Sequence, residues 1–352
     1  MKKSDKNSFP VGTIRIKAKN LQPVKKTKNS WKKTDFETHN IKRIVHLFKA
    51  HANFNTLLDS KDKTFLKGYL TQKKRTGGEK LNIMPNGDKL DKAYSLFAPH
   101  LMIHDEENDT HWDIIFQNPN GEYSYLYTFK KKKESTIKKY KKVKDFKKHL
   151  PILKKNLKKA LHKGELMALP LYTLLKTKMR VGNKYSYSTS GHQGLTTLQK
   201  HNINIQKNKT TFSYLGKDGV PQEKTEKFPE IYLKKLSESI SNKKKKDFIF
   251  TDKLGNPLKD THFEKAFKEY CGQQFYPHIV RSYYATNTVE NYLKKNKKPS
   301  KEQIIKLYTK IADQLGHKKF VKKDNEWETS YTITIAHYIQ PELIDKINKI
   351  IN

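Results

Sequence analysis

A lysine-dense segment at residues 130–148, with the sequence KKKKESTIKKYKKVKDFKK, constrains how this chain can fold more than any other feature. Such a run of like charges is typical of a solvated helix face or of a link between two lobes. The 352 residues of the chain are enough for two domains with a sizeable core. We therefore expect a lysine-rich connector at residues 131–148, with one domain before it and one after it.

We expect two different segments in the part of the chain before this connector. Residues 1–40 are rich in lysine and poor in apolar positions, which is typical of a flexible basic arm. Residues 41–130 contain a hairpin signal at 111–129, where two strand-like runs flank the turn sequence NPNG. Tyr123 and Tyr125 alternate in this hairpin and so share one face, which packs either on the core or on a partner.

The part after the connector, residues 149–352, has a mostly helical pattern. Leucines recur at spacings of three and four between residues 150 and 161. The strand-like segments GLTTL, INIQ and TTFSYLG follow. A later helix is signalled by a capping box of Ser300 with Gln303, and Gly316 suits its end. We therefore expect an α+β fold: a small, mainly β N-terminal domain and a larger, mostly helical domain with a small β-sheet.

The charge of the chain predicts a polyanionic partner. Lys and Arg total 73 and Asp and Glu total 35, which gives a formal net charge of +38. Nucleic acid is the first candidate partner, since lysine and arginine that neutralise phosphates release condensed counterions. An anionic membrane surface is the alternative, but no apolar run approaches the roughly 18–20 residues of a membrane span. Cys271 is the single cysteine, so the sequence excludes an intramolecular disulfide and fits a reducing intracellular setting.

Five polar residues in the second half of the chain form a candidate site for phosphate chemistry. Arginine can hold two phosphate oxygens at once and stays charged, and preorganised donors of this kind stabilise a charged transition state. A tyrosine beside such donors could attack the phosphorus and form a covalent phosphotyrosine. Order, spacing and flanking residues carry this prediction, because any single basic residue in so basic a chain is more simply surface charge. The five residues are Arg180 in MRVGN, Lys217 in LGKDG, Arg281 in HIVRSYYAT, His317 in QLGH and Tyr338 in AHYIQP.

These segments resemble those of type IB DNA topoisomerases of the poxvirus and bacterial kind, the eukaryotic-like topoisomerase I family. RVGN and GLTTL, with Arg180 and Gly194 fourteen residues apart, resemble the first active-site segment of that family. YLGKDG resembles the hairpin with the catalytic lysine, thirty-seven residues after Arg180. VRSYYAT, LGH and HYIQPELID resemble the segments with the second arginine, the histidine and the tyrosine. The resemblance covers about residues 111–352, and the DNA breaking-rejoining fold that it implies is shared with tyrosine recombinases.

The resemblance implies a role for each of the five residues. Arg180 and Arg281 would clamp one phosphate, and His317 would donate to a nonbridging oxygen. Lys217 would be the general acid that protonates the leaving 5′-oxygen, and Tyr338 would be the nucleophile that forms a 3′-phosphotyrosine.

The implied activity is relaxation of supercoiled DNA by transient cleavage of one strand, swivelling and religation. Because the covalent link preserves the bond energy, this chemistry requires no ATP, and we expect no metal ion or other cofactor. The expected partner is double-stranded DNA, clamped by a monomer with the help of residues 41–130. We expect no membrane association and a cytoplasmic, nucleoid-associated location, or a viral or nuclear one if the source is a virus.

The chain departs from the family pattern near the nucleophile. The interval from His317 to Tyr338 is twenty-one residues, and residues 318–333 look like an insertion. This insertion contains Tyr331, a rival nucleophile; the YIQP context favours Tyr338. His278 lies three residues before Arg281 in a pattern typical of recombinases, and it either touches the phosphate or packs nearby.

Candidate DNA contacts outside the five residues are four tyrosines, Tyr123, Tyr125, Tyr185 and Tyr187, together with His278. The family has a tyrosine six residues after its first arginine, where this chain has Ser186 between Tyr185 and Tyr187. Tyr123 and Tyr125 match a tyrosine pair that contacts DNA in relatives. The alternative function is that of a tyrosine recombinase or integrase that exchanges strands between specific sites. A recombinase should carry a compact helical domain before its catalytic domain, where this chain has a predicted β-hairpin.

Overall fold

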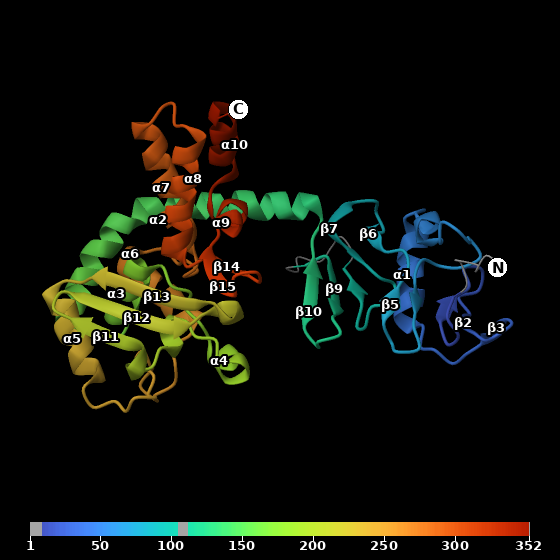
Figure 1. Cartoon of the computed structure of the whole chain (residues 1–352), viewed down its shortest axis with the longest axis horizontal. Coiled ribbons are helices and arrows are strands. Elements are labelled where there is room, and N and C mark those ends of the chain that lie inside the picture. Colours follow the sequence, from blue (N-terminus) through green and yellow to red (C-terminus); the bar gives the residue numbers. More distant parts are fainter. Residues whose placement is uncertain (1–8, 105–111, 352) are drawn as a thin grey trace. The chain divides into compact units, whose positions relative to one another are not determined.

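The computed structural model describes residues 9–104 and 112–351, which divide into two compact units, Met1–Ile137 and Lys138–Asn352 (Figure 1). Short strands dominate the first unit, and helices with a small sheet dominate the second. The expected α+β fold, with a mainly β N-terminal part and a mostly helical C-terminal part, is therefore confirmed.

The N-terminal unit consists of small antiparallel sheets. Its strand orders are β3-β2-β1-β4-β5, β10-β9-β8 and β6-β7. The elements are β1 (Ile14–Ile16), β2 (Pro23–Lys26), β3 (Trp31–Lys33), α1 (His39–Ala50), η1 (Phe54–Leu57), β4 (Tyr69–Leu70), β5 (Thr76–Gly77), β6 (Leu81–Ile83), β7 (Lys89–Tyr94), β8 (Met102–Ile103), β9 (Ile114–Gln117) and β10 (Tyr123–Leu126). The predicted tyrosine hairpin is thus present as β9 and β10.

The expected flexible arm at residues 1–40 is wrong for its described part. From residue 9 onward this segment forms β1, β2 and β3, which pair in antiparallel register. Few apolar residues are needed because these strands are short and bury few side chains: Ile16 and Val24 are buried, while most lysines remain outside. Residues 1–8 lie outside the described residues.

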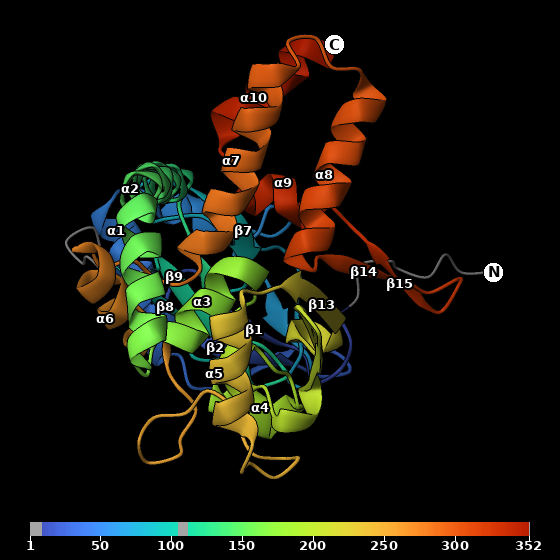
Figure 2. The same cartoon turned by 90° about the vertical axis from the view of Figure 1, so that its left-hand side faces the viewer.

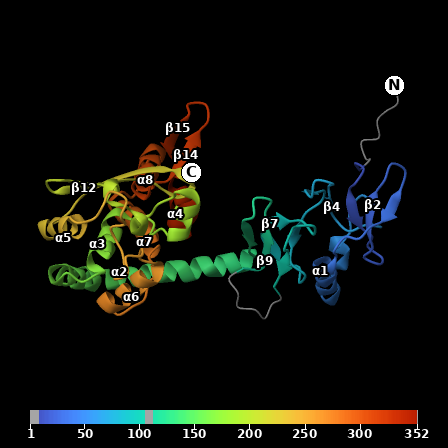
Figure 3. The ribbon, with the colours of Figure 1, turned by 90° about the horizontal axis from the view of Figure 1, so that it is seen from below.

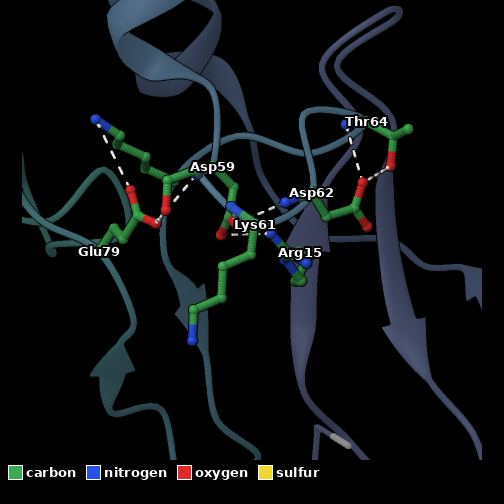
Figure 4. A network of polar contacts seen from close by, with 8 residues as sticks. Arg15, Asp59, Lys61, Asp62, Thr64 and Glu79 are labelled. Carbon is green, nitrogen blue, oxygen red and sulfur yellow. Dashed lines mark hydrogen bonds and ion pairs between the residues drawn. The ribbon is translucent and has the colours of Figure 1, made fainter. Parts of the chain in front are cut away.

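A buried arginine shows how the first strand is held in this unit. The Arg15 guanidinium forms an ion pair with Asp59 at 2.7 Å and lies over the rings of Phe9 and Phe65 at 4.8 and 4.2 Å. Figure 4 shows the Asp59 side chain beside Arg15. The same carboxylate accepts a hydrogen bond from the N–H of Asp62 at 3.1 Å. A buried charge needs such a partner, so this network fixes β1 in place.

The C-terminal unit contains most of the long helix α2 and all the elements after it. The first residues of α2, up to Ile137, belong to the N-terminal unit. The three-stranded sheet has the order β11-β12-β13. The elements are α2 (Phe129–Lys163), α3 (Ala168–Thr177), α4 (Lys184–Ser190), η2 (Leu195–Thr197), η3 (Lys200–Asn202), β11 (Ile203–Gln206), β12 (Lys209–Leu215), η4 (Lys217–Gly219), β13 (Pro221–Lys227), α5 (Glu230–Ile240), α6 (Asp260–Cys271), α7 (Ile279–Lys295), α8 (Lys301–Leu315), β14 (Lys318–Val321), β15 (Glu326–Thr329), α9 (Thr332–Tyr338) and α10 (Pro341–Ile351).

The expected connector at residues 131–148 is not a separate element. It forms the first half of α2, a single continuous helix that the leucine pattern extends to Lys163 (Figure 3). Tyr140, Val143 and Phe146 are buried at helical spacing within the lysine run. The lysines therefore cover the solvated face of a helix, and the division between the two units falls at residues 137 and 138.

Two apolar clusters organise the C-terminal unit. One lies where α3 and α5 pack by the three-stranded sheet, with the rings of Phe228 and Tyr232 stacked at 4.1 Å. The other lies among α7, α8, α9 and α10, which gather in one group (Figure 2). The predicted capping box of α8 is confirmed by hydrogen bonds in both directions between Ser300 and Gln303, and Gly316 ends the helix at φ +68°.

Candidate active site

The segment with Arg180 is held by the segment with Gly194. The backbone N–H of Leu195 donates to the Arg180 carbonyl at 2.8 Å, and that of Thr196 donates to the Val181 carbonyl at 2.8 Å. A Cβ on Gly194 would lie 2.7 Å from the Arg180 carbonyl oxygen and 2.6 Å from the nitrogen of Gly182. Only glycine permits this approach, which explains why RVGN and GLTTL belong together.

The GLTTL segment itself differs from the expected strand. Residues 195–197 form the 3-10 turn η2, which hydrogen bonds its own neighbours instead of a sheet. The threonines of this segment direct their hydroxyls inward: Thr196 Oγ1 donates to the Val181 carbonyl at 3.0 Å. Local side-chain bonds of this kind compete with strand pairing, which the alternation of residue types does not reveal.

Lys217 lies at the tip of the hairpin formed by β12 and β13, as the YLGKDG pattern predicts. It begins the turn η4, where Asp218 and Gly219 adopt positive φ angles of +62° and +74°. The side chain of Lys217 is exposed, and it makes no hydrogen bond or ion pair with the residues that the structure describes. Its charge nevertheless reaches His278, whose pKa it helps to lower.

Arg281 is the most enclosed of the five residues, with 2% of its surface exposed. It projects from the first turn of α7 and donates to the carbonyls of Lys178 at 2.5 Å and Leu315 at 2.9 Å. Burial lowers its pKa, while the Tyr338 hydroxyl opposes this shift as a nearby hydrogen-bond acceptor. Its Nε is buried without a hydrogen-bond partner among the described residues. Arg281 therefore joins α3, α7 and α8 and keeps one donor free.

His317 follows the end of α8 and is neutral. Arg281 donates to His317 Nε2 at 2.8 Å, so the other ring nitrogen, Nδ1, carries the proton and donates to Thr334 Oγ1 at 2.7 Å. Burial and the nearby charges of Arg281 and Arg180 lower the pKa of His317 to about 2. Thr334 and Tyr338 are four residues apart on α9, so the same helix face orients the imidazole and carries the tyrosine.

The last carbonyls of α8 are capped by side chains from the hairpin. Lys224 on β13 donates to the carbonyls of Asp313 and Gln314 at 2.7 and 2.9 Å. Gln222, on the same strand, donates to the Gly316 carbonyl at 2.9 Å. Burial lowers the pKa of Lys224 to about 8. These contacts fix the position of the chain just before His317 relative to the hairpin that carries Lys217.

Tyr338, and not Tyr331, lies beside the two basic residues. It ends α9, is 5% exposed, and its ring centroid lies 4.7 Å from that of His317 and 5.2 Å from the Arg281 guanidinium. Tyr331 lies at the other end of α9, where its ring is near that of Tyr308 at 6.0 Å. Of the two tyrosines, the structure brings only Tyr338 to Arg281 and His317.

His278 also lies beside Tyr338. It precedes the first residue of α7, and its ring centroid lies 5.2 Å from that of Tyr338. Burial lowers the pKa of His278 to about 3, and the charges of Arg281, Arg180, Lys139 and Lys217 add to this shift. His278 is therefore a neutral ring that packs on Tyr338 inside a strongly positive site.

Among the residues that the structure describes, neither Arg180 nor Arg281 forms an ion pair with an acidic side chain. Arg180 is half-buried, and its guanidinium forms no hydrogen bond or ion pair with the described residues, yet its charge lowers the pKa of His278 and His317. Near these residues, Glu226 is already paired with Lys178 at 3.6 Å. Cations gathered without a counter-charge are suited to bind an anion.

The insertion at residues 318–333 begins with a two-stranded hairpin. Strands β14 and β15 pair from Lys318 with Thr329 to Val321 with Glu326. The N–H of Ser330 then donates to the His317 carbonyl at 2.9 Å, so the hairpin returns the chain to its starting point. The long interval between His317 and Tyr338 thus leaves the two side chains together.

The predicted DNA-contacting tyrosines are mostly exposed. Tyr123 and Tyr125 on β10 are 45% and 42% exposed, so this face of the hairpin does not pack on the core. Tyr185 on α4 is 78% exposed, whereas Tyr187 is half-buried with its ring against Phe248 at 5.4 Å. The structure therefore leaves Tyr123, Tyr125 and Tyr185 exposed to solvent and Tyr187 half-buried.

The sequence interpretation missed residues that hold the site together. Lys224 is buried on a strand without apolar residues, so its pattern gives no signal. Thr334 could have been found, because it lies one helical turn before Tyr338. In the described parts of the chain there is no group of three or more His, Cys, Asp or Glu that could hold a metal ion. No helix within those parts is long and apolar enough to cross a membrane.

Comparisons with known proteins agree with the resemblance. DNA topoisomerase 1 beta of Arabidopsis thaliana is 23% identical over 234 residues, which are 62% of this chain and 25% of that protein. The chain thus matches about a quarter of the length of that relative. Solved structures of a XerH site-specific recombinase bound to difH, before and after cleavage, match at 15% identity with a TM-score of 0.35. The pre-cleavage match covers 57% of this chain and 52% of that one.

The family model gives the decisive match. The model of the eukaryotic DNA topoisomerase I catalytic core covers residues 128–345, which include the whole candidate site from Arg180 to Tyr338. These residues are well over half of the chain. By this match, the chain belongs to the eukaryotic DNA topoisomerase I catalytic core family.

Proposed function

We propose that this protein relaxes supercoiled DNA by cutting and rejoining one strand through a 3′-phosphotyrosine at Tyr338. The observation that carries the proposal is the convergence of Tyr338, at the end of α9, with Arg281 in α7, His278 just before α7 and His317 just after α8. The charge of Arg180 also reaches this group. A buried phenol surrounded by uncompensated cations is suited to attack a phosphodiester.

The covalent step exchanges one phosphorus–oxygen bond for another. Tyr338 Oη attacks the phosphorus and releases its proton to water, while the bond from phosphorus to the 5′-oxygen breaks. Lys217, on the exposed tip of its hairpin, gives its proton to the leaving 5′-oxygen. The reverse attack by the 5′-hydroxyl rejoins the strand, and no ATP or metal ion takes part in the proposed scheme.

Arg281 and His317 hold the charge that develops on the nonbridging oxygens. Arg281 offers its unpartnered Nε, and Arg180 offers a guanidinium that the described residues leave free. His317 Nε2 accepts a hydrogen bond from Arg281, so it must gain a proton before it can donate to the phosphate. The negative charge of a bound phosphate favours that protonated form. Loss of one such donor is expected to slow cleavage by ~10²–10³-fold.

The first test is plasmid relaxation with EDTA present and ATP omitted. Catalytic amounts of the protein should relax negatively and positively supercoiled plasmid alike, because free swivelling has no preferred sign. Tyr338→Phe should abolish the covalent protein–DNA adduct trapped by denaturant, and Tyr331→Phe should retain it. Adduct formed by Tyr338→Phe but not by Tyr331→Phe would reverse the assignment of the nucleophile.

A tyrosine recombinase is the second candidate, favoured by one observation. The H-x-x-R histidine, His278, lies against the Tyr338 ring at 5.2 Å. This alternative predicts strand exchange between paired sites and no relaxation of plasmid that lacks such a site. Relaxation of unrelated plasmids would exclude it.

A further inference from the structure

The end of helix α9, where Tyr338 lies, is held by side chains from other helices. Three consecutive backbone carbonyls each accept a hydrogen bond from a side chain far away in the sequence. The pairs are Lys139 Nζ with the His337 carbonyl, Thr286 Oγ1 with the Tyr338 carbonyl at 3.2 Å, and Tyr140 Oη with the Ile339 carbonyl at 2.6 Å.

These carbonyls need partners because of where they lie. The last four carbonyls of an α-helix have no donor within the helix, and α9 has only seven residues. A cation near a helix C-terminus also interacts favourably with the helix dipole, which suits Lys139. So short a helix has little stability of its own. The orientation of its last residue, Tyr338, therefore depends on these outside contacts.

The two donor side chains from α2 are enclosed by the protein: Tyr140 is buried and Lys139 is half-buried. Tyr140 is 6% exposed, and burial raises its pKa, so its hydroxyl remains a donor at neutral pH. The Lys139 amine lies over the rings of Tyr140 and Tyr338 at 5.2 and 5.6 Å, and burial lowers its pKa. Lys138, one residue earlier, is exposed and makes no hydrogen bond or ion pair with the described residues.

We propose that Lys139 and Tyr140 are positioning residues for Tyr338. Together they donate hydrogen bonds to the carbonyls of the residues on both sides of Tyr338. These bonds keep the Tyr338 hydroxyl in position to attack the phosphorus. This inference rests on the proposed function, in which Tyr338 is the nucleophile. It assigns to α2 a part in the chemistry, although none of its side chains belongs to the five residues that the family pattern identifies.

The test measures single-turnover formation of the covalent adduct on a DNA duplex. Lys139→Met removes the donor and keeps most of the unbranched side chain, and Lys138→Met is the matched control on the same helix. We expect Lys139→Met to form adduct ~10-fold or more slowly with DNA affinity close to that of the control, since small misplacement of a reacting group slows reactions strongly. Lys139→Arg, which keeps a cationic donor, should recover part of the rate.

A second substrate separates positioning of the nucleophile from protonation of the leaving group. With sulfur in place of the bridging 5′-oxygen, the leaving group is a thiolate, which departs without a proton because thiols ionise at much lower pH than alcohols. This substrate should rescue Lys217→Ala and should leave Lys139→Met slow. Rescue of Lys139→Met would overturn the inference.

The remaining outcomes are also decisive. If Lys139→Met and Lys138→Met form adduct at equal rates while the unaltered protein is active, the positioning role is wrong and the proposed function stands. If the unaltered protein forms no adduct, the proposed function fails and this inference falls with it. If Lys139→Met does not fold, Tyr140→Phe, which keeps the buried ring, replaces it, and an unchanged rate for that variant would overturn the inference.

Discussion

At the scale of single residues, the site keeps its histidines neutral among positive charges. Arg281 donates to His317 Nε2, and a guanidinium has no acceptor to offer in return. The His278 ring lies beside that of Tyr338 and is exposed to the same positive charges. Both rings are therefore prevented from taking a proton until a negative charge arrives. In the proposed mechanism we therefore expect the histidines to gain a proton only when phosphate binds.

This neutrality predicts how stability depends on pH. An unfolded histidine has a pKa of about 6.5, whereas the folded pKa of His278 is about 3. Between these values the unfolded state binds a proton that the folded state does not, so stability is lost as pH falls through this window. For one such group the slope approaches ~1.4 kcal/mol per pH unit. His278→Gln should therefore weaken the fall in melting temperature below about pH 6.5.

The comparison requires a histidine outside the site. His162 is exposed near the end of α2, so His162→Gln is the control for removing a histidine that lies outside the site. Thermal unfolding followed by circular dichroism at several pH values gives a curve of melting temperature against pH for the unaltered protein and for each of the two variants. Parallel curves for the unaltered protein and His278→Gln would contradict a neutral, buried His278.

At the scale of elements, a contact between two glycines fixes Arg180. Gly194→Ala would place a methyl group 2.6 Å from Gly182 N and 2.7 Å from the Arg180 carbonyl oxygen, both of them backbone atoms. We expect it to destabilise the C-terminal unit by ~1–3 kcal/mol and to reduce cleavage because Arg180 moves. Chemical denaturation and adduct formation measure the two effects.

A glycine in open space is the control for this substitution. Gly191 ends α4 with φ +70°, and a Cβ there would have nothing within 4 Å. Gly191→Ala should destabilise only through backbone strain, by ~1–2 kcal/mol, and should leave cleavage intact. Equal loss of cleavage in both variants would show that Arg180 does not depend on the close approach at Gly194.

The elements also show which sequence signals were sufficient. Helix α8 follows from a capping box, an apolar stripe and a terminal glycine, all of which are local. The strands of residues 14–33 were missed because each buries at most two side chains. The connector was mistaken for a separate element because Tyr140, Val143 and Phe146 are sparse among the lysines that surround them.

The candidate site was predictable where it follows a family pattern and not elsewhere. Arg281, His317 and Tyr338 come together as their motifs suggest. Lys139 could not be recognised, because its neighbours Lys138 and Lys141 are identical in type and only tertiary contacts distinguish them. Contacts between a side chain and a distant backbone carbonyl leave no trace in residue type or spacing.

At the scale of the whole molecule, the net charge of +38 predicts how binding responds to salt. Each lysine or arginine that neutralises a phosphate releases counterions, so affinity for DNA should fall steeply as salt rises. With about 6–10 phosphate contacts, raising salt from about 50 to 200 mM should weaken binding by ~10³–10⁵-fold. Fluorescence anisotropy with a labelled duplex measures it, and a flat response would contradict a phosphate-dominated interface.

The hairpin of β14 and β15 has a consequence for protein engineering. Its two ends are tied together by the hydrogen bond from Ser330 to the His317 carbonyl, so its length is independent of the distance between His317 and Tyr338. The exposed turn at Asp324 and Asn325 is therefore a permissive position. A fluorescent reporter or a recognition peptide could be encoded there, within the catalytic unit itself, without changing the distance in space between those two residues.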